Sequence, residues 1–264
     1  AEDINIIVLA DMRSDFTEEE FRNFDAYLER GGNLFILGEP KRQQFMNPVI
    51  ERLGLRFADG IIVSPSEVNL DDLVAANIKE GAAKVSENYI RYFRSGYSIM
   101  TPSACAVEVI DSAKGFEITE VLASAGKGSW VEKETTDFIN EKSVLNPAVG
   151  EVEKSNSIML YLTRPVNNKE QRIFVIGDAD CISTLELSQN RPGFRSSNFT
   201  LITETFRNLS YGEFPVEASR VNPPDDRVLV TRNVIFGIRV VLMWIIPLLF
   251  VTGCITLLIR RKRK

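Results

Sequence analysis

Residues 4–40 decide the fold, and they read INIIVLADMRSDFTEEEFRNFDAYLERGGNLFILGEP. The run from Ile4 to Ala10 is apolar and rich in β-branched residues, which is the pattern of a buried parallel strand. Thr17 and Glu20 have the spacing of a capping box, so a helix is expected to begin after Thr17. Two glycines end that helix, and the apolar run from Asn33 to Leu37 predicts a second strand. This stretch therefore predicts a βαβ unit.

The rest of the domain continues the alternation of helices and strands. The patterns predict helices over residues 43–53, 71–77 and 196–209, and strands over residues 61–63, 104–110, 116–123, 157–163 and 172–176. The last helix is expected to pack through Phe199, Ile202 and Phe206. Such an order of elements is typical of an α/β domain.

The C-terminal end has the composition of a membrane span. Val240 to Ile259 reads VVLMWIIPLLFVTGCITLLI, without a charge, and the basic run from Arg260 to Lys264 follows at once. Twenty helical residues cover roughly 30 Å, the hydrocarbon thickness of a bilayer. Basic residues beside a span favour the cytoplasmic side, so residues 1–239 are expected on the other side of the cytoplasmic membrane. The alternative is a buried core helix.

These patterns divide the chain into four parts. We expect an extracytoplasmic α/β domain over residues 1–222, a Pro- and Asp-containing linker over 223–239, a transmembrane helix over 240–259 and a cytoplasmic basic tail over 260–264. No signal peptide is recognisable at the start of the sequence. A domain that crosses the membrane is therefore expected to follow earlier membrane segments or to result from processing.

Composition excludes several kinds of chemistry. The 264 residues include no histidine, which excludes Ser-His-Asp and Cys-His triads and His-containing zinc sites. The net charge is −5, and the tail holds basic residues only, so the domain itself is more acidic still. An acidic surface argues against nucleic-acid binding. No Walker A loop is present, and no cofactor is predicted.

Acidic residues follow three of the predicted strands, and they are the main candidates for a binding site. They are Asp11 (with Arg13 beside it), Glu39, and the pair Asp178 and Asp180. Ligands of open α/β sheets bind beyond the carboxyl ends of the strands, so these residues could line a cleft for a polyol, a cation or a basic loop of a partner. Alternatively each carboxylate caps a helix or stabilises a turn. Two carboxylates alone do not define a metal site.

Two further side chains leave alternatives open. Trp130, in the loop segment Gly126 to Trp130, could stack on a sugar or could be buried in packing. Cys105 and Cys181 could form a disulfide, which sequence cannot test.

Several of these segments, in this order, resemble the auxiliary domain of uncharacterised ABC transport systems, a group that includes gliding-motility accessory proteins. The turn at Asp11-Met12-Arg13 is similar to the family's D-P-R turn, with Met12 in place of proline. The Thr17–Glu20 helix start and the GG-N-L segment at residues 31–34 also match. So do the S-W-x-E segment at residues 129–132 and the segment RIFVIGDAD at 172–180.

The resemblance implies a flavodoxin-like or glutamine-amidotransferase-like domain with a mostly parallel sheet and added β elements. It also implies ABC permease and ATPase subunits as partners, and leaves the substrate and the oligomeric state open. Amidotransferase-like folds carry a catalytic cysteine at a strand–helix turn, whereas Ser64-Pro65-Ser66 follows the strand here. The likeness therefore implies no catalysis.

We accordingly expect a non-catalytic accessory or scaffolding component of an export or gliding-related ABC system. The alternatives are a membrane-anchored, metal-dependent hydrolase that uses Asp and Glu, and an extracytoplasmic glycan-binding module.

Overall fold

The structure is a computed structural model that describes residues 4–111, 114–191, 193–215 and 232–263. The chain forms two compact units, Ala1–Val216 and Glu217–Lys264. The elements of the first unit are β1 (Ile6–Ala10), α1 (Glu18–Glu29), β2 (Asn33–Leu37), α2 (Gln43–Ile50), β3 (Leu55–Phe57), β4 (Ile61–Val63), β5 (Leu73–Ile78), α3 (Glu87–Arg94), β6 (Ile99–Pro102), β7 (Val107–Val109), β8 (Glu117–Ala123), β9 (Trp130–Glu132), β10 (Ser157–Val166), β11 (Lys169–Ile176), α4 (Thr184–Ser188) and α5 (Asn198–Leu209). Short 3-10 turns lie at Glu51–Leu53, Glu80–Lys84, Pro147–Val149 and Asp180–Ile182.

The βαβ unit is confirmed. β1 and β2 pair in parallel, from Ile6 opposite Asn33 to Ala10 opposite Leu37. Thr17 and Glu20 form the reciprocal capping box at the start of α1. The helix ends at two glycines because the chain turns back closely against it: a Cβ on Gly32 would lie 2.2 Å from the Tyr27 ring.

The central sheet has seven strands in the order β1-β2-β11-β10-β8-β5-β6. Among the described strands of this sheet, the parallel pairs are β1–β2 and β2–β11. The pairs β11–β10, β10–β8, β8–β5 and β5–β6 are antiparallel. The expectation of a mostly parallel, flavodoxin-like sheet is therefore wrong, and the sheet is mixed.

A tight hairpin explains this difference. Asn167 and Asn168 both adopt positive φ, 49° and 61°, as a two-residue hairpin turn requires. Such a turn can join only antiparallel neighbours, so β10 and β11 run in opposite directions over their whole length. The sheet then continues antiparallel from β10 to β6.

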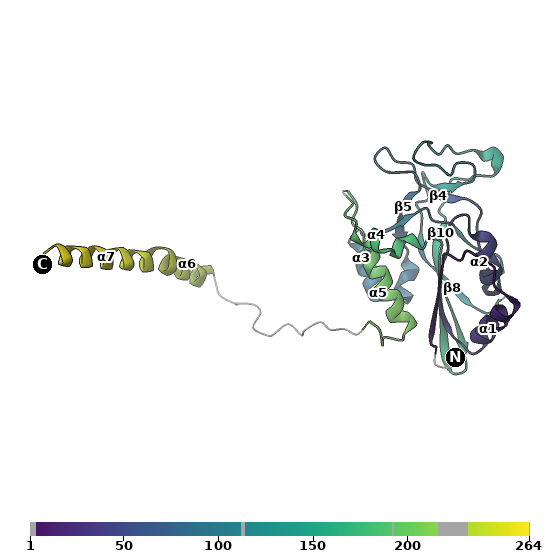
Figure 1. Cartoon of the computed structure of the whole chain (residues 1–264), viewed down its shortest axis with the longest axis horizontal. Helices are drawn as coiled ribbons and strands as arrows, with labels where there is room; N and C mark the ends of the chain where they lie inside the picture. The colour runs from purple at the N-terminus through teal and green to yellow at the C-terminus, as the bar shows by residue number, and fades with distance from the viewer. Residues whose placement is uncertain (1–3, 112–113, 192, 216–231, 264) are drawn as a thin grey trace. The chain divides into compact units, whose positions relative to one another are not determined.

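Each face of the sheet is covered by helices (Figure 1). Side chains alternate across β2. Leu34 and Ile36 belong to the core beneath α1 and α2, while Phe35 and Leu37 belong to the core beneath α3 and α5. The buried Asn33 links the elements: its Nδ2 donates to the Leu209 carbonyl at 2.7 Å, and its Oδ1 accepts from the Arg172 amide at 2.8 Å. The asparagine of the GG-N-L segment thus ties β2 to α5 and β11.

Two expected elements differ from the structure. Residues 71–77, expected to be helical, include most of strand β5, whose side chains alternate between buried and more exposed positions. The helix α5 forms within the expected range and packs through Phe206, as expected, and through the buried Leu201, Thr205 and Leu209. Phe199, also expected to pack, is 68% exposed.

The second unit contains one long helix. It begins at Arg232, and its stretch Val234–Lys262, 29 residues, is among the described residues the one helical segment long and apolar enough to cross a membrane. It comprises α6 (Arg232–Val240), a π turn at Val241–Ile245 and α7 (Ile246–Lys262). The π turn directly precedes Pro247, which lacks an amide donor for the regular helical ladder. Residues 232–239, part of the expected linker, are helical; its residues 223–231 lie outside the described part of the chain.

The large side chains of this helix are exposed, including Trp244 and Phe250. Within its own unit, the helix is therefore not covered by other described residues.

Candidate functional site

The acidic residues that follow β1, β2 and β11 lie at one edge of the sheet. These strands are parallel neighbours, so their carboxyl ends coincide. Main-chain hydrogen bonds hold the ends of the three strands side by side. The Asp11 amide donates to the Leu37 carbonyl at 3.2 Å, and the Gly38 amide donates to the Ile176 carbonyl at 2.8 Å. We call Asp11, Glu39, Asp178 and Asp180 the acidic strand ends.

Glu39, which follows β2, connects this strand end to the loop that follows β11. Its Oε1 accepts hydrogen bonds from the amides of Ala179 and Asp180, at 3.0 and 3.2 Å. Burial raises the pKa of the Glu39 carboxyl to about 7, and the charges of Asp180 and Asp11 act in the same direction. The two amide hydrogen bonds oppose the rise without cancelling it. Glu39 therefore titrates close to neutral pH.

Asp178 is fully buried and caps the turn that follows β11. Its Oδ1 accepts from the amides of Asp180 and Cys181, at 2.8 and 3.2 Å. Within the described residues, its Oδ2 has no hydrogen-bond partner. Burial, and secondly the Glu39 charge, raise the pKa of Asp178 well above its ordinary value, so its neutral form is favoured.

Asp11 is paired with two arginines. Arg13 Nη2 lies 2.6 Å from Asp11 Oδ2, and Arg42 Nε lies 3.2 Å from Asp11 Oδ1. The residue also has a φ of 41°, a conformation that aspartate tolerates better than most residues. The two arginines offset the negative charge of Asp11, and burial favours the neutral form of Asp178.

Trp130 is not part of this cluster. It lies on β9, which pairs with β4 in a separate two-stranded sheet, and packs with Ile61, Val63 and Phe138. The residue is 7% exposed, and its Nε1 donates to Glu132 Oε2 at 3.3 Å. This geometry corresponds to the buried-packing alternative, since a stacking platform for a sugar needs an open ring face.

Cys105 is a neighbour of the acidic strand ends that sequence reasoning did not assign to them. Its amide donates to the Gly177 carbonyl at 2.8 Å, and a Cβ on Gly177 would lie 1.9 Å from the Cys105 carbonyl oxygen. Burial, with Glu39 and Asp178 nearby, raises the pKa of the Cys105 thiol. The glycine in the segment I-G-D was the available signal for this close approach.

Cys105 and Cys181 are both buried, free thiols, so the disulfide alternative is not formed. In the part of the chain that the structure describes, no group of three or more His, Cys, Asp or Glu side chains is arranged to hold a metal ion. Two of the acidic strand ends make hydrogen bonds to the main chain: Asp178 caps the turn after β11, and Glu39 accepts from the amides of Ala179 and Asp180.

Comparison with known proteins identifies the family. The N-terminal domain of mmIFT52 has a similar structure, with a TM-score of 0.53 at 16% identity, over 79% of this chain and 78% of that one. At that identity the likeness concerns the fold alone. No curated protein matches the chain. The family model described as an ABC-type uncharacterized transport system matches residues 1–210, and the chain therefore belongs to that family.

Proposed function

We propose that this protein is a non-catalytic scaffold of an ABC-type export or gliding-related system, anchored in the cytoplasmic membrane with its α/β domain outside. The observation that carries the proposal is the family match over residues 1–210, followed in the same chain by an apolar helix of membrane-spanning length. The family associates the domain with ABC transport, and the helix would place it beside the membrane subunits.

The chemistry of the described residues supports a non-catalytic role. The chain has no histidine to act as a general base. Burial raises the pKa of both Cys105 and Cys181, which keeps these thiols protonated and therefore weakly nucleophilic. Glutamine or ester hydrolysis by the purified chain, abolished by Cys105→Ala, would contradict this part of the proposal.

The association with a transporter is tested by purification from native membranes. Affinity-tagged full-length chain, isolated in mild detergent, should carry an ABC ATPase and a permease at fixed ratios, measured by quantitative mass spectrometry. An unrelated membrane protein with the same tag and a single C-terminal span is the control. Enrichment of both subunits no greater than in that control would overturn the proposal.

The orientation is tested by labelling single cysteines in a Cys254→Ser background. Val68 is 87% exposed on the domain, and Lys262 lies at the C-terminal end of α7. A membrane-impermeant maleimide should label Val68→Cys in intact cells and Lys262→Cys only after lysis. The reverse result would place the domain in the cytoplasm.

A further inference from the structure

No described strand pairs with the outer edge of strand β1. β1 is the terminal strand of the seven-stranded sheet and pairs only with β2 among the described strands. The residues with odd numbers direct their main-chain groups toward β2, as the Asn5 carbonyl and the Asp11 amide do. In a parallel ladder, Ile6, Val8 and Ala10 then direct their amides and carbonyls outward.

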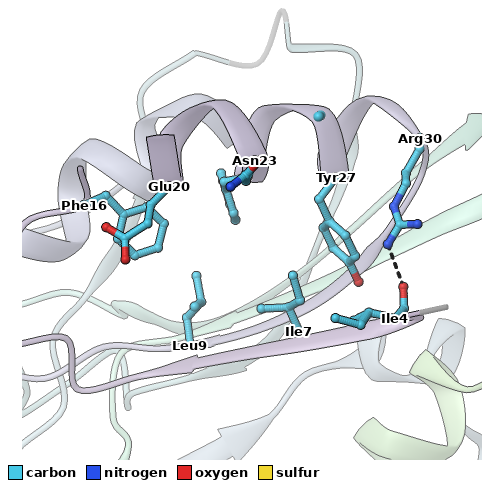
Figure 2. Close-up of a pocket in the computed structure, with 10 residues that line it drawn as sticks. Ile4, Ile7, Leu9, Phe16, Glu20, Asn23, Tyr27 and Arg30 are labelled. Carbon is cyan, nitrogen blue, oxygen red and sulfur yellow. Dashed lines mark hydrogen bonds between the residues drawn. The ribbon is translucent and has the colours of Figure 1, made fainter. Parts of the chain in front are cut away.

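An apolar groove runs along this edge, between β1 and α1 (Figure 2). Its volume is about 540 Å³, and Ile7, Leu9, Phe16, Phe24 and Tyr27 line it. On the other face of the strand Val8 is 44% exposed. The free edge thus has apolar surface on both sides.

The sequence of β1 does not protect this edge. Terminal strands of monomeric proteins carry charges, prolines or bulges that prevent pairing with another chain. β1 reads IIVLA, which has none of these and resembles a strand with neighbours on both sides. A further strand is the element that the sequence of β1 fits.

The charged residues at the two ends of the groove favour a second copy of this chain as the partner of β1. Arg30 lies at the Ile4 end of the groove, where its Nη2 donates to the Ile4 carbonyl at 2.8 Å, and Glu20 lies at the Leu9 end (Figure 2). A two-fold axis midway between the Ile7 residues of two copies would pair β1 with an antiparallel copy of itself, Ile6 opposite Val8 and Ile4 opposite Ala10. That register brings Arg30 of each copy opposite Glu20 of the other.

We propose that two copies of this chain associate through β1 to form one continuous sheet across a two-fold axis. The outward main-chain groups of each β1 pair with those of the other copy, and the apolar sides of both strands become covered. This inference is independent of the proposed transport role, because it concerns how the chain assembles with itself.

The test measures the mass of the full-length chain in detergent micelles over a range of concentrations, by light scattering with detergent correction. Wild type should be a dimer. Val8→Lys, at an exposed position, should raise the dissociation constant at least about tenfold because two charges enter the strand interface. Val8→Thr, a β-branched control of similar shape, should remain a dimer. A monomeric wild type, or a Val8→Lys variant as dimeric as wild type, would overturn the proposal; the second result would place any dimer contact elsewhere, such as in the membrane helix.

A cross-linking experiment tests the axis directly in the Cys254→Ser background. Ile7→Cys would form a disulfide with its own copy, since facing residues of a non-hydrogen-bonded antiparallel pair have Cα atoms about 4.5 Å apart. Val68→Cys, on a remote exposed turn, is the matched control. Under mild oxidation Ile7→Cys should form covalent dimers far faster than Val68→Cys, and equal rates would exclude β1 from the axis.

Discussion

Replacing Glu39 with glutamine should change how the stability of the domain depends on pH. In the folded protein the pKa of Glu39 rises from 4.5 to about 7, chiefly through burial. Between these two values the unfolded chain has lost this proton and the folded chain has kept it. The free energy of unfolding should therefore fall as pH rises through this window, and the contribution of the protonated carboxyl is complete only below pH 4.5.

The size of the effect follows from the shift. A pKa rise of this size corresponds to about 3 kcal/mol if no solvent screens the carboxyl. Glu39 is only partly buried, so water screens part of the interaction and we expect on the order of 1–2 kcal/mol. Glutamine keeps an oxygen that can accept from the amides of Ala179 and Asp180, and it cannot ionise.

Thermal unfolding of the full-length chain in detergent, followed by circular dichroism from pH 4.5 to 8.5, measures this difference. The Glu39→Gln variant should lose less stability than wild type as pH rises across the window. Any dependence of its stability on pH that remains would include the ionisation of Asp178, whose pKa is also raised. Glu67→Gln, at an exposed turn, is the matched control. Parallel stability curves for wild type and Glu39→Gln would refute the reasoning.

Three further substitutions test the structure. Asp178→Asn should change stability at pH 7 by less than about 1 kcal/mol, because burial favours the neutral carboxyl and Asn keeps the capping oxygen. Asp178→Ala should cost more, because it removes the cap. Chemical denaturation of both variants checks this. Gly177→Ala should destabilise the domain by more than about 2 kcal/mol, because the added Cβ would meet the Cys105 carbonyl. Gly126→Ala is the control, since the atom nearest to its added Cβ would be 4.0 Å away, and it should not destabilise the domain. The same denaturation series measures both variants. Thr17→Ala should cost about 1 kcal/mol through loss of the capping box, and an unchanged melting temperature would contradict the assigned start of α1.

The elements that local sequence specifies were predictable. Thr17, Glu20 and the glycines after α1 act within a few residues of their own positions, so the βαβ unit could be located closely. Strand order could not, because the pairing of β2 with β11 joins segments about 140 residues apart in sequence, and no local pattern encodes it. The Asn167-Asn168 turn was a usable signal for an antiparallel hairpin, and the resemblance to parallel folds outweighed it.

The wrong expectation of a helix over residues 71–77 also has a physical cause. In residues 71–77 alanine and asparagine dilute the alternation that marks a strand, and burial of Val74, Ala76 and Ile78 decides the outcome through tertiary contacts.

At the candidate site, the acidic residues were recognisable from their positions after strands. The two arginines on Asp11 and the burial of Asp178 depend on the folded chain, so the partners and the burial of the acidic strand ends could not be inferred beforehand.

The parallel pairing of β2 with β11 also constrains the order in which the domain can be built during synthesis. Leu34 must wait for Ile173 before the centre of the sheet can close. At 5–20 residues per second the ribosome needs roughly 7–28 s to make the residues between them. During this time the inner edge of β2 and its face toward α3 and α5 lack their final neighbours. The β10–β11 hairpin, by contrast, forms within microseconds once it is made. The N-terminal βαβ unit is therefore the part of the nascent chain with the longest need of protection from aggregation, for example by a chaperone.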